Sequence, residues 1–216
     1  MYVPAHFDES RTEALHDFIK QHPFGMLVTH AASGLDVNHI PFELDPGQGG
    51  QGGLTAHVAR ANPVWRNVAD GDEVLVVFRA ADAYISPNWY PSKHEFHKQV
   101  PTWNYMVVHA YGRITIRDDE RFVRGVVGRL TRTHEASQAK PWKMSDSPKD
   151  VIDAMLKAIV GIEIAITRLV GKSKLSQNKD ARDIRGAAAM LKAQADHVIG
   201  DAMLAGVKAG PGEAAN

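Results

Sequence analysis

The chain has 216 residues with 25 basic and 25 acidic side chains, so its formal net charge is zero. A neutral chain lacks the electrostatic field expected of a strong nucleic-acid binder. Cysteine is absent, which excludes disulfides, thiolate metal sites and cysteine nucleophiles, while a hydrophobic content of 44% is typical of a folded globular protein.

Neither the first residues of the sequence nor its most apolar stretch predicts a membrane protein. The first seven residues, Met1 to Phe7, have no basic region and no apolar region of a secretory signal. The stretch 158–171 is interrupted by Glu163 and Arg168, and it is too short and too charged to span a bilayer. We therefore expect a cytoplasmic protein with no membrane partner.

The first half of the chain predicts a helix followed by strands. A pattern typical of a capping box, Ser10-Arg11-Thr12-Glu13, starts the helix, and His22-Pro23 ends it. Pro41 cannot donate to a ladder, so its strand should lie at an edge or a bulge. A glycine-rich run at 47–53 has the GxGxxG spacing, but a strand follows it instead of a helix, which favours a hairpin loop over a dinucleotide site. The expected elements are strands at 24–30, 35–44, 54–59 and 73–80 and a short helix starting at Asn62-Pro63.

The second half of the chain predicts one long strand and several helices. Residues 86–100 are expected to form a long polar and aromatic loop. Gly112 could mark a bulge in the long strand 104–116. The remaining expected elements are a further strand near Tyr84-Ile85, helices around 122–130 and from Ser147-Pro148, a strand at 162–167, and an Ala-rich helix over 180–207. Antiparallel strands with appended helices predict an α+β fold built on a small barrel.

Arg60 is a candidate phosphate ligand. It follows the strand 54–59 and comes just before the expected helix cap at Asn62. A guanidinium beside free helix N–H groups suits a phosphate. The alternative is an ordinary surface arginine.

The segment Val100-Pro101-Thr102-Trp103-Asn104-Tyr105 mixes aromatic faces with a hydroxyl and an amide. This mixture suits a flat heteroaromatic ligand, which needs apolar stacking and a few fixed polar contacts. Tyr84, Trp89 and Tyr90 add to the aromatic content. The alternative is a structural aromatic cluster beneath the long loop.

Histidine and lysine residues give three further candidates. His94 and His97 have the spacing of half a metal site, but a solvated loop is favoured, and no metal site is predicted. His57 and His109 lie on expected strands and suit ordinary half-buried histidines. Residues 172–185 hold five cations and two anions, which could contact an anionic ligand or nucleic acid, or form a solvated turn and helix start.

Several motifs in order, from Met1 to about Leu191, resemble the PaiB-type family of FMN-binding negative transcriptional regulators. Their order along nearly the whole chain makes the resemblance specific. The glycine-rich run at 47–53 and the tail after Val207 have no counterpart in it. The motifs are Met1-Tyr2-Val3-Pro4 with His6-Phe7, His39-Ile40-Pro41, His57-Val58-Ala59-Arg60-Ala61-Asn62-Pro63, Tyr84-Ile85-Ser86-Pro87 with Trp89-Tyr90 and Lys93, residues 100–105, Gly161-Ile162-Glu163, and Gly171-Lys172 with Lys174-Leu175-Ser176-Gln177-Asn178.

The resemblance implies an FMN-binding split β-barrel of about six strands, with the flavin at a homodimer interface. It implies a split-barrel domain over 1–172, a C-terminal helical appendage over 173–207 and a frayed tail over 208–216. By analogy with pyridoxamine-phosphate oxidases, Arg60 would bind the phosphate. The other implied cofactor residues are Asn38, His39 and Ile40 along the isoalloxazine, Thr102, Trp103 and Asn104 at its polar edge or dimethylbenzene end, and Lys93, Lys174, Ser176 and Gln177 toward the phosphate or ribityl chain.

Three functions are compatible with this resemblance. The first is an FMN-binding regulatory protein, a negative transcriptional regulator with DNA as a partner. DNA contact has little support in the residues, because the charge is neutral and no recognition helix is evident. The second is an FMN-dependent oxidoreductase of the flavin reductase or pyridoxamine-phosphate oxidase type, in which the cofactor carries the hydride and no catalytic side chain is assigned. The third is a haem-binding split barrel with His57 or His109 as axial ligand.

Overall fold

The computed structural model describes residues 1–207, so the predicted frayed tail at 208–216 lies outside the described residues. Two compact units interleave along the chain. One unit comprises residues 1–10, 79–107 and 170–207, and the other comprises residues 11–78 and 108–169. The predicted appendage 173–207 therefore shares its unit with segments from the N-terminus and the middle of the chain.

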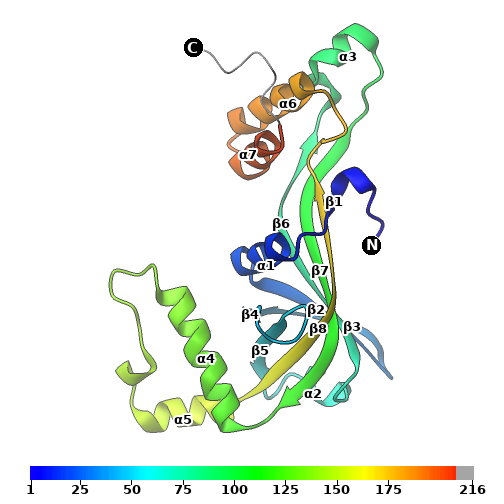
Figure 1. The fold of residues 1–216 in the computed structure, drawn as a ribbon. Helices are drawn as coiled ribbons and strands as arrows, with labels where there is room; N and C mark the ends of the chain where they lie inside the picture. The colour runs from blue at the N-terminus through cyan, green and yellow to red at the C-terminus, as the bar shows by residue number, and fades with distance from the viewer. Residues whose placement is uncertain (208–216) are drawn as a thin grey trace. The chain divides into compact units, whose positions relative to one another are not determined.

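The strands form one eight-stranded sheet, which confirms the α+β split-barrel fold (Figure 1). Its order is β3-β2-β6-β7-β8-β5-β4, with β1 paired to β8. The strands are β1 (Asp8–Glu9), β2 (Phe24–Ala31), β3 (Gly34–Pro41), β4 (Glu43–Asp45), β5 (Gly53–Ala59), β6 (Glu73–Ile85), β7 (Thr102–Arg117) and β8 (Ile159–Lys174). Pro41 ends β3, which stands at one end of this strand order, as the missing N–H donor predicts.

The unit of residues 11–78 and 108–169 holds the main apolar core. On β5, Leu54, Ala56 and Val58 point into this core, as strand alternation predicts. The hairpin between β4 and β5 pairs Asp45 with Gly53, so the glycine-rich run is a hairpin loop as expected. The helices of this unit are α1 (Thr12–Gln21), α2 (Val64–Asn67), α4 (Glu120–Glu135) and α5 (Lys149–Lys157), with a 3-10 turn at Met144–Asp146.

The unit of residues 1–10, 79–107 and 170–207 has a core of its own. Tyr90 and Ile199 are fully buried there, and α6 packs against α7 (Figure 1). Its helices are α3 (Pro91–Phe96), α6 (Ala181–Ala193) and α7 (His197–Ala205), with 3-10 turns at Ala5–Phe7 and Pro87–Trp89. No helix within residues 1–207 is both long enough and apolar enough to cross a membrane.

Five local predictions were wrong. The strand expected at 35–44 is divided at Phe42 into β3, which pairs with β2, and β4, which pairs with β5. The capping box does not form, because α1 begins after Arg11, whose side chain makes no capping bond. The two strands expected at 73–80 and 84–85 are one strand, β6. The loop 86–100 contains α3, and the helix expected over 180–207 is interrupted at Ala195, which has a positive φ of 64°.

Gly112 serves close packing in β7. A Cβ atom on Gly112 would come within 2.5 Å of a methyl group of Ile164 and 2.6 Å of the carbonyl oxygen of Ala165. The absence of a side chain therefore lets β8 approach β7 closely at this point.

Candidate functional site

A hollow of about 200 Å³ lies in the unit of residues 1–10, 79–107 and 170–207. Four of the residues expected to bind the cofactor line it. Its polar lining comes from the start of β7 and from the end of β8 with the turn that follows. No carboxylate and no histidine lines it. The lining residues are Phe7, Val100, Pro101, Thr102, Asn104, Lys174, Ser176, Asn178 and Lys179.

The hollow is electropositive because both of its lysines have neutral partners. The Nζ atom of Lys174 donates to Oγ1 of Thr102 at 2.5 Å. The Nζ atom of Lys179 donates to Oε1 of Gln99 at 2.6 Å. Neither lysine forms an ion pair with a carboxylate in the part of the chain that the structure describes. Two such ammonium groups at one hollow favour an anionic ligand.

A buried network holds the floor of the hollow. Asn104 is fully buried, and its Nδ2 donates to Oγ of Ser176 at 3.0 Å. The hydroxyl of Tyr90 lies 3.2 Å from the same Oγ atom. Burial is the main cause that raises the pKa of Tyr90, so its phenol stays protonated and available as a donor. Ser176 has φ 66°, a left-handed conformation that is costly for a non-glycine residue, so the network holds it there against strain.

A second buried group positions Lys179. The carboxylate of Asp183, on α6, accepts hydrogen bonds from the backbone N–H of Ser92 at 2.9 Å and from its Oγ at 2.6 Å. The amide of Gln99 donates to Oγ of Ser92 at 2.8 Å and accepts from Lys179. Through this chain of bonds, α3 and α6 fix the amide that orients the lysine.

The other expected residues of this unit lie outside the hollow. Trp103 alternates with Thr102 and Asn104, is 54% exposed and forms an edge contact with Tyr84 at 5.9 Å. Lys93 donates to Oδ1 of Asn88. Gln177 closes its own turn, accepting from the backbone N–H of Leu175 and donating to the carbonyl oxygen of Ser173. Strand alternation thus separates Trp103 from Thr102 and Asn104, with which the prediction had grouped it.

In the other unit, strand alternation likewise divides the predicted triplet on β3. His39 is exposed and stacks on Phe24 at a centroid distance of 6.4 Å. Ile40 is buried in the apolar core. The Asn38 amide donates to Asp36 at 3.0 Å, and its oxygen accepts from Asn62 at 2.7 Å. The three side chains therefore do not share one face, and their role toward the flavin stays a prediction.

Arg60 has its guanidinium occupied by protein groups. Its Nη1 and Nη2 atoms donate to the carboxylate of Asp118 at 2.8 and 2.5 Å. Its Nε donates to the carbonyl oxygen of Lys157 at 2.7 Å. The same pairing lowers the pKa of Asp118, so the carboxylate stays charged. A phosphate would have to compete with this ion pair, and the phosphate role of Arg60 stays a prediction.

Two histidines carry buried ring nitrogens without partners. Nδ1 of His57 and Nδ1 of His109 have no hydrogen-bond partner among the described residues. Burial lowers the pKa of both imidazoles, and for His109 the charge of Arg168 contributes in the same direction. Both rings are therefore neutral near pH 7. Metal sites built from three or more histidine or acidic side chains are absent from residues 1–207.

Sequence reasoning missed Lys179 and Asn178 as members of the hollow. Lys179 was counted only within the basic cluster 172–185. The structure divides that cluster, because Arg182 pairs with Glu95 and Lys172 is buried beside Tyr105. A usable signal was the sequence Lys174-Leu175-Ser176-Gln177-Asn178-Lys179, which ends a strand with two lysines and a turn.

Residues 1–168 match the family described as "Putative FMN-binding domain". The chain belongs to this family. Flavin mononucleotide is therefore its cofactor, and the resemblance noted from the motifs is confirmed.

Relatives support this assignment over most of the chain. The chain is 30% identical to the protease synthase and sporulation protein PAI 2 of Bacillus subtilis, over 85% of each chain. It is 33% identical to an uncharacterised protein of Emericella nidulans, over 86% of this chain and 88% of the other.

Solved structures share the fold at low sequence identity. The flavocytochrome Anf3 of Azotobacter vinelandii has a TM-score of 0.59 at 11% identity, over 84% of this chain and 77% of the other. The FAD and haem binding protein of Mycobacterium smegmatis has a TM-score of 0.54 at 15% identity, over 82% and 78%. These likenesses support the split-barrel fold.

The hollow lined by Thr102, Lys174 and Lys179 has the character of an anion-binding site. Two lysines without carboxylate partners and a hydroxyl are groups that can hold an anion such as a phosphate, while the fully buried Asn104 amide donates to Ser176 beneath them. Bound flavin would supply hydride or electron transfer, while the protein would supply binding and orientation.

Proposed function

We propose that this protein is an FMN-binding regulatory protein whose hollow around Lys174 holds the phosphate end of the flavin. The observation that carries the proposal is the pair of lysines, Lys174 and Lys179, whose partners at the hollow are neutral. Thr102 would add a hydroxyl beside the ammonium groups, and Asn104 would hold Ser176 beneath them. Lys93, Trp103 and Gln177 lie outside the hollow and are not assigned to the phosphate end.

An exposed apolar face supports a homodimer with flavin at its interface. On β2 and β3, Phe24, Leu35 and Val37 are 64%, 76% and 48% exposed. The register of the hairpin pairs Val28 with Val37, so these side chains share one face of the sheet. Leu35 and Val37 are neighbours on this face, and the exposed His39 separates them from Phe24. Exposed apolar side chains gathered on one face favour a protein interface.

A regulatory role is favoured by the name of one relative, since the donors of the hollow would serve a regulator and an oxidoreductase alike. The lining of the hollow contains no histidine, aspartate or glutamate, so it suits the holding of an anion. One relative is named as a protease synthase and sporulation protein, which agrees with a role in control. Direct contact with DNA would require a basic surface, and the cluster 172–185 is divided by burial and by ion pairing.

An FMN-dependent oxidoreductase is the second candidate, because a flavin needs no protein acid or base for hydride transfer. A haem-binding split barrel is the third, and the unpartnered Nδ1 atoms of His57 and His109 support it. A Soret band on haem titration that disappears in His57→Ala or His109→Ala would favour haem.

The deciding experiment is a fluorescence and absorbance titration of the purified protein with FMN. We expect quenched flavin fluorescence, saturation at one FMN per chain and a dimer by light scattering. No bleaching of the bound flavin by NADH or NADPH under anaerobic conditions, with salt-sensitive retention of a specific DNA, would support the regulator. Rapid bleaching without DNA retention would support the oxidoreductase, and absence of FMN uptake would contradict both.

A further inference from the structure

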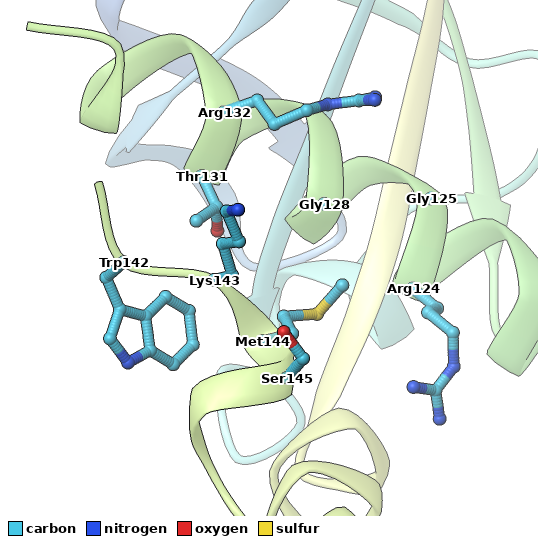
Figure 2. Close-up of a pocket in the computed structure, with 9 residues that line it drawn as sticks. All are labelled: Arg124, Gly125, Gly128, Thr131, Arg132, Trp142, Lys143, Met144 and Ser145. Atoms are coloured by element: carbon cyan, nitrogen blue, oxygen red, sulfur yellow. The ribbon is translucent and has the colours of Figure 1, made fainter. Parts of the chain in front are cut away.

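A second hollow lies beside α4, and it contains none of the residues expected to bind FMN. Its volume is about 490 Å³, which is within the range of small-molecule sites. Figure 2 shows the indole of Trp142 at one end, the guanidinium of Arg124 at the other, and Met144 and Ser145 between them. The lining residues are Arg124, Gly125, Gly128, Thr131, Arg132, Trp142, Lys143, Met144 and Ser145.

The cations at this hollow divide into paired and unpaired groups. Arg124 donates to Glu120 at 2.9 Å and to Asp153 at 2.6 Å, so its charge is balanced. Arg132 and Lys143 are exposed and have no carboxylate within ion-pair distance among residues 1–207. No carboxylate lines the hollow, so its net character is cationic.

The acidic groups nearby hold the backbone of the loop. Glu135, at the end of α4, accepts a hydrogen bond from the backbone N–H of Trp142 at 2.8 Å. Asp146 accepts one from the backbone N–H of Lys143 at 3.0 Å. These two bonds fix the main chain of Trp142 and Lys143, although the indole remains 42% exposed. An anchored, exposed tryptophan is a ready stacking surface.

Two glycines form the wall of the hollow on α4. Glycine in a helix interior lowers helix stability, so a glycine at such a position calls for a structural or functional explanation. At Gly128 a Cβ would lie 3.3 Å from the methyl group of Met144, so Met144 would have to shift by a few tenths of an ångström. At Gly125 a Cβ would meet only the flexible tip of Arg129 at 3.5 Å. The protein's own packing therefore does not require Gly125, and the space above it is open.

We propose that this hollow binds a small aromatic anion of the nucleoside-monophosphate class. The indole of Trp142 and the thioether of Met144 would contact the ring, and Lys143 would bind the phosphate. The bare backbone at Gly125 leaves room for the ring against the helix. This site is independent of the proposed flavin site, since the two share no residue.

The test is calorimetric titration of protein carrying one equivalent of FMN with adenosine 5′-monophosphate. Adenosine and inorganic phosphate are titrated separately, so that the contribution of the ring to the affinity is separated from that of the phosphate. We expect AMP to bind at least about tenfold more tightly than either fragment. Trp142→Ala should weaken AMP by about tenfold or more, and Lys143→Gln should weaken it severalfold and reduce its salt dependence.

Two matched variants separate binding from folding. Lys140→Gln removes an exposed lysine from the same loop outside the hollow, and AMP affinity should stay unchanged. Gly125→Leu fills the space with a good helix former, and it should abolish AMP binding without lowering the melting temperature.

Several results would overturn the proposal. Absence of AMP binding, or equal affinity in wild type and Trp142→Ala, would remove the site. Binding of AMP only to FMN-free protein would show that it occupies the flavin site. A single-stranded oligonucleotide that binds more than tenfold more tightly, with the same dependence on Trp142 and Lys143, would make this surface a nucleic-acid interface instead.

Discussion

The ammonium group of Lys174 donates to the hydroxyl of Thr102 over 2.5 Å, and no carboxylate in the described part of the chain forms an ion pair with it. This relationship places at the hollow a charge that an anionic ligand would neutralise. We expect Lys174→Gln to weaken FMN binding by about 1.5–3 kcal/mol, the range for a hydrogen bond to a charged group. Fluorescence titration with FMN gives this value directly.

A matched control for Lys174→Gln is Lys98→Gln. Lys98 is exposed and does not line the hollow, so the same loss of charge should leave FMN affinity unchanged. The salt dependence of FMN binding should fall in Lys174→Gln alone. Equal effects of the two substitutions would mean that general charge, and not this hollow, attracts the flavin.

Ser176 should matter for stability as much as for binding. Its Oγ atom is the partner of two buried groups, the Asn104 amide and the Tyr90 hydroxyl. Ser176→Ala leaves both without that partner, and we expect a loss of about 1–3 kcal/mol in the free energy of unfolding. Urea denaturation followed by circular dichroism measures it.

The positive φ of Ser176 allows a comparison between two substitutions. Ser176→Gly loses the same hydroxyl but tolerates φ 66° without strain, so it should be less destabilising than Ser176→Ala. Ser173→Ala is the control, because Ser173 contributes only its carbonyl oxygen to the turn. If Ser176→Gly proved more destabilising than Ser176→Ala, backbone strain would have no part in the effect.

Local sequence patterns predicted the strands and the hairpin better than the site. The alternation of Leu54, Ala56 and Val58 indicates directly which face of the strand is buried, because every second side chain of a strand points to the same face. The break at Ala195 could not be predicted, since alanine favours helix, and the new start depends on Asp196 accepting from the backbone N–H of Ile199.

The site was predicted less well because its contacts join distant segments. Thr102 and Lys174 are 72 residues apart, and Arg60 and Asp118 are 58 apart. Motif membership brought Thr102, Asn104, Lys174 and Ser176 into one group, and the structure places them at one hollow. It also brought in Trp103, which strand alternation turns to the other side. No local pattern indicates that a carboxylate will occupy the guanidinium of Arg60.

Arg60 and Asp118 should act as a structural pair. Arg60 joins the end of β5 to Asp118 and to the carbonyl oxygens of Lys157 and Ile159. We expect Arg60→Gln and Asp118→Asn each to lower the melting temperature, and the double variant to add little to either one. Differential scanning calorimetry of the three variants gives this comparison.

The same variants test the phosphate role predicted for Arg60. A structural pair predicts that FMN affinity is unchanged in Arg60→Gln and in Asp118→Asn. A phosphate ligand predicts weaker FMN binding in Arg60→Gln and, because the guanidinium is released, equal or tighter binding in Asp118→Asn. The two roles therefore differ in the sign of the Asp118→Asn effect.

Folding stability should fall on mild acidification because of two partly buried histidines. Burial lowers the pKa of His57 and His109 below the ordinary value of about 6.5 that they regain on unfolding. Below about pH 6.5 the unfolded chain takes up protons that the folded protein does not, so the free energy of unfolding decreases. It should be constant between pH 7 and 8 and fall between pH 6.5 and 5.5, as urea midpoints at each pH would show.

Substitution of the histidines identifies the source of this pH dependence. His57→Gln and His109→Gln should each make the decline between pH 6.5 and 5.5 shallower, because each removes one proton uptake by the unfolded chain. A residual slope is expected from His22, whose pKa burial also lowers. His134→Gln is the control, since His134 is exposed on α4, and its curve should follow the wild type. An unchanged slope in the double variant His57→Gln/His109→Gln would show that other groups cause the acid sensitivity.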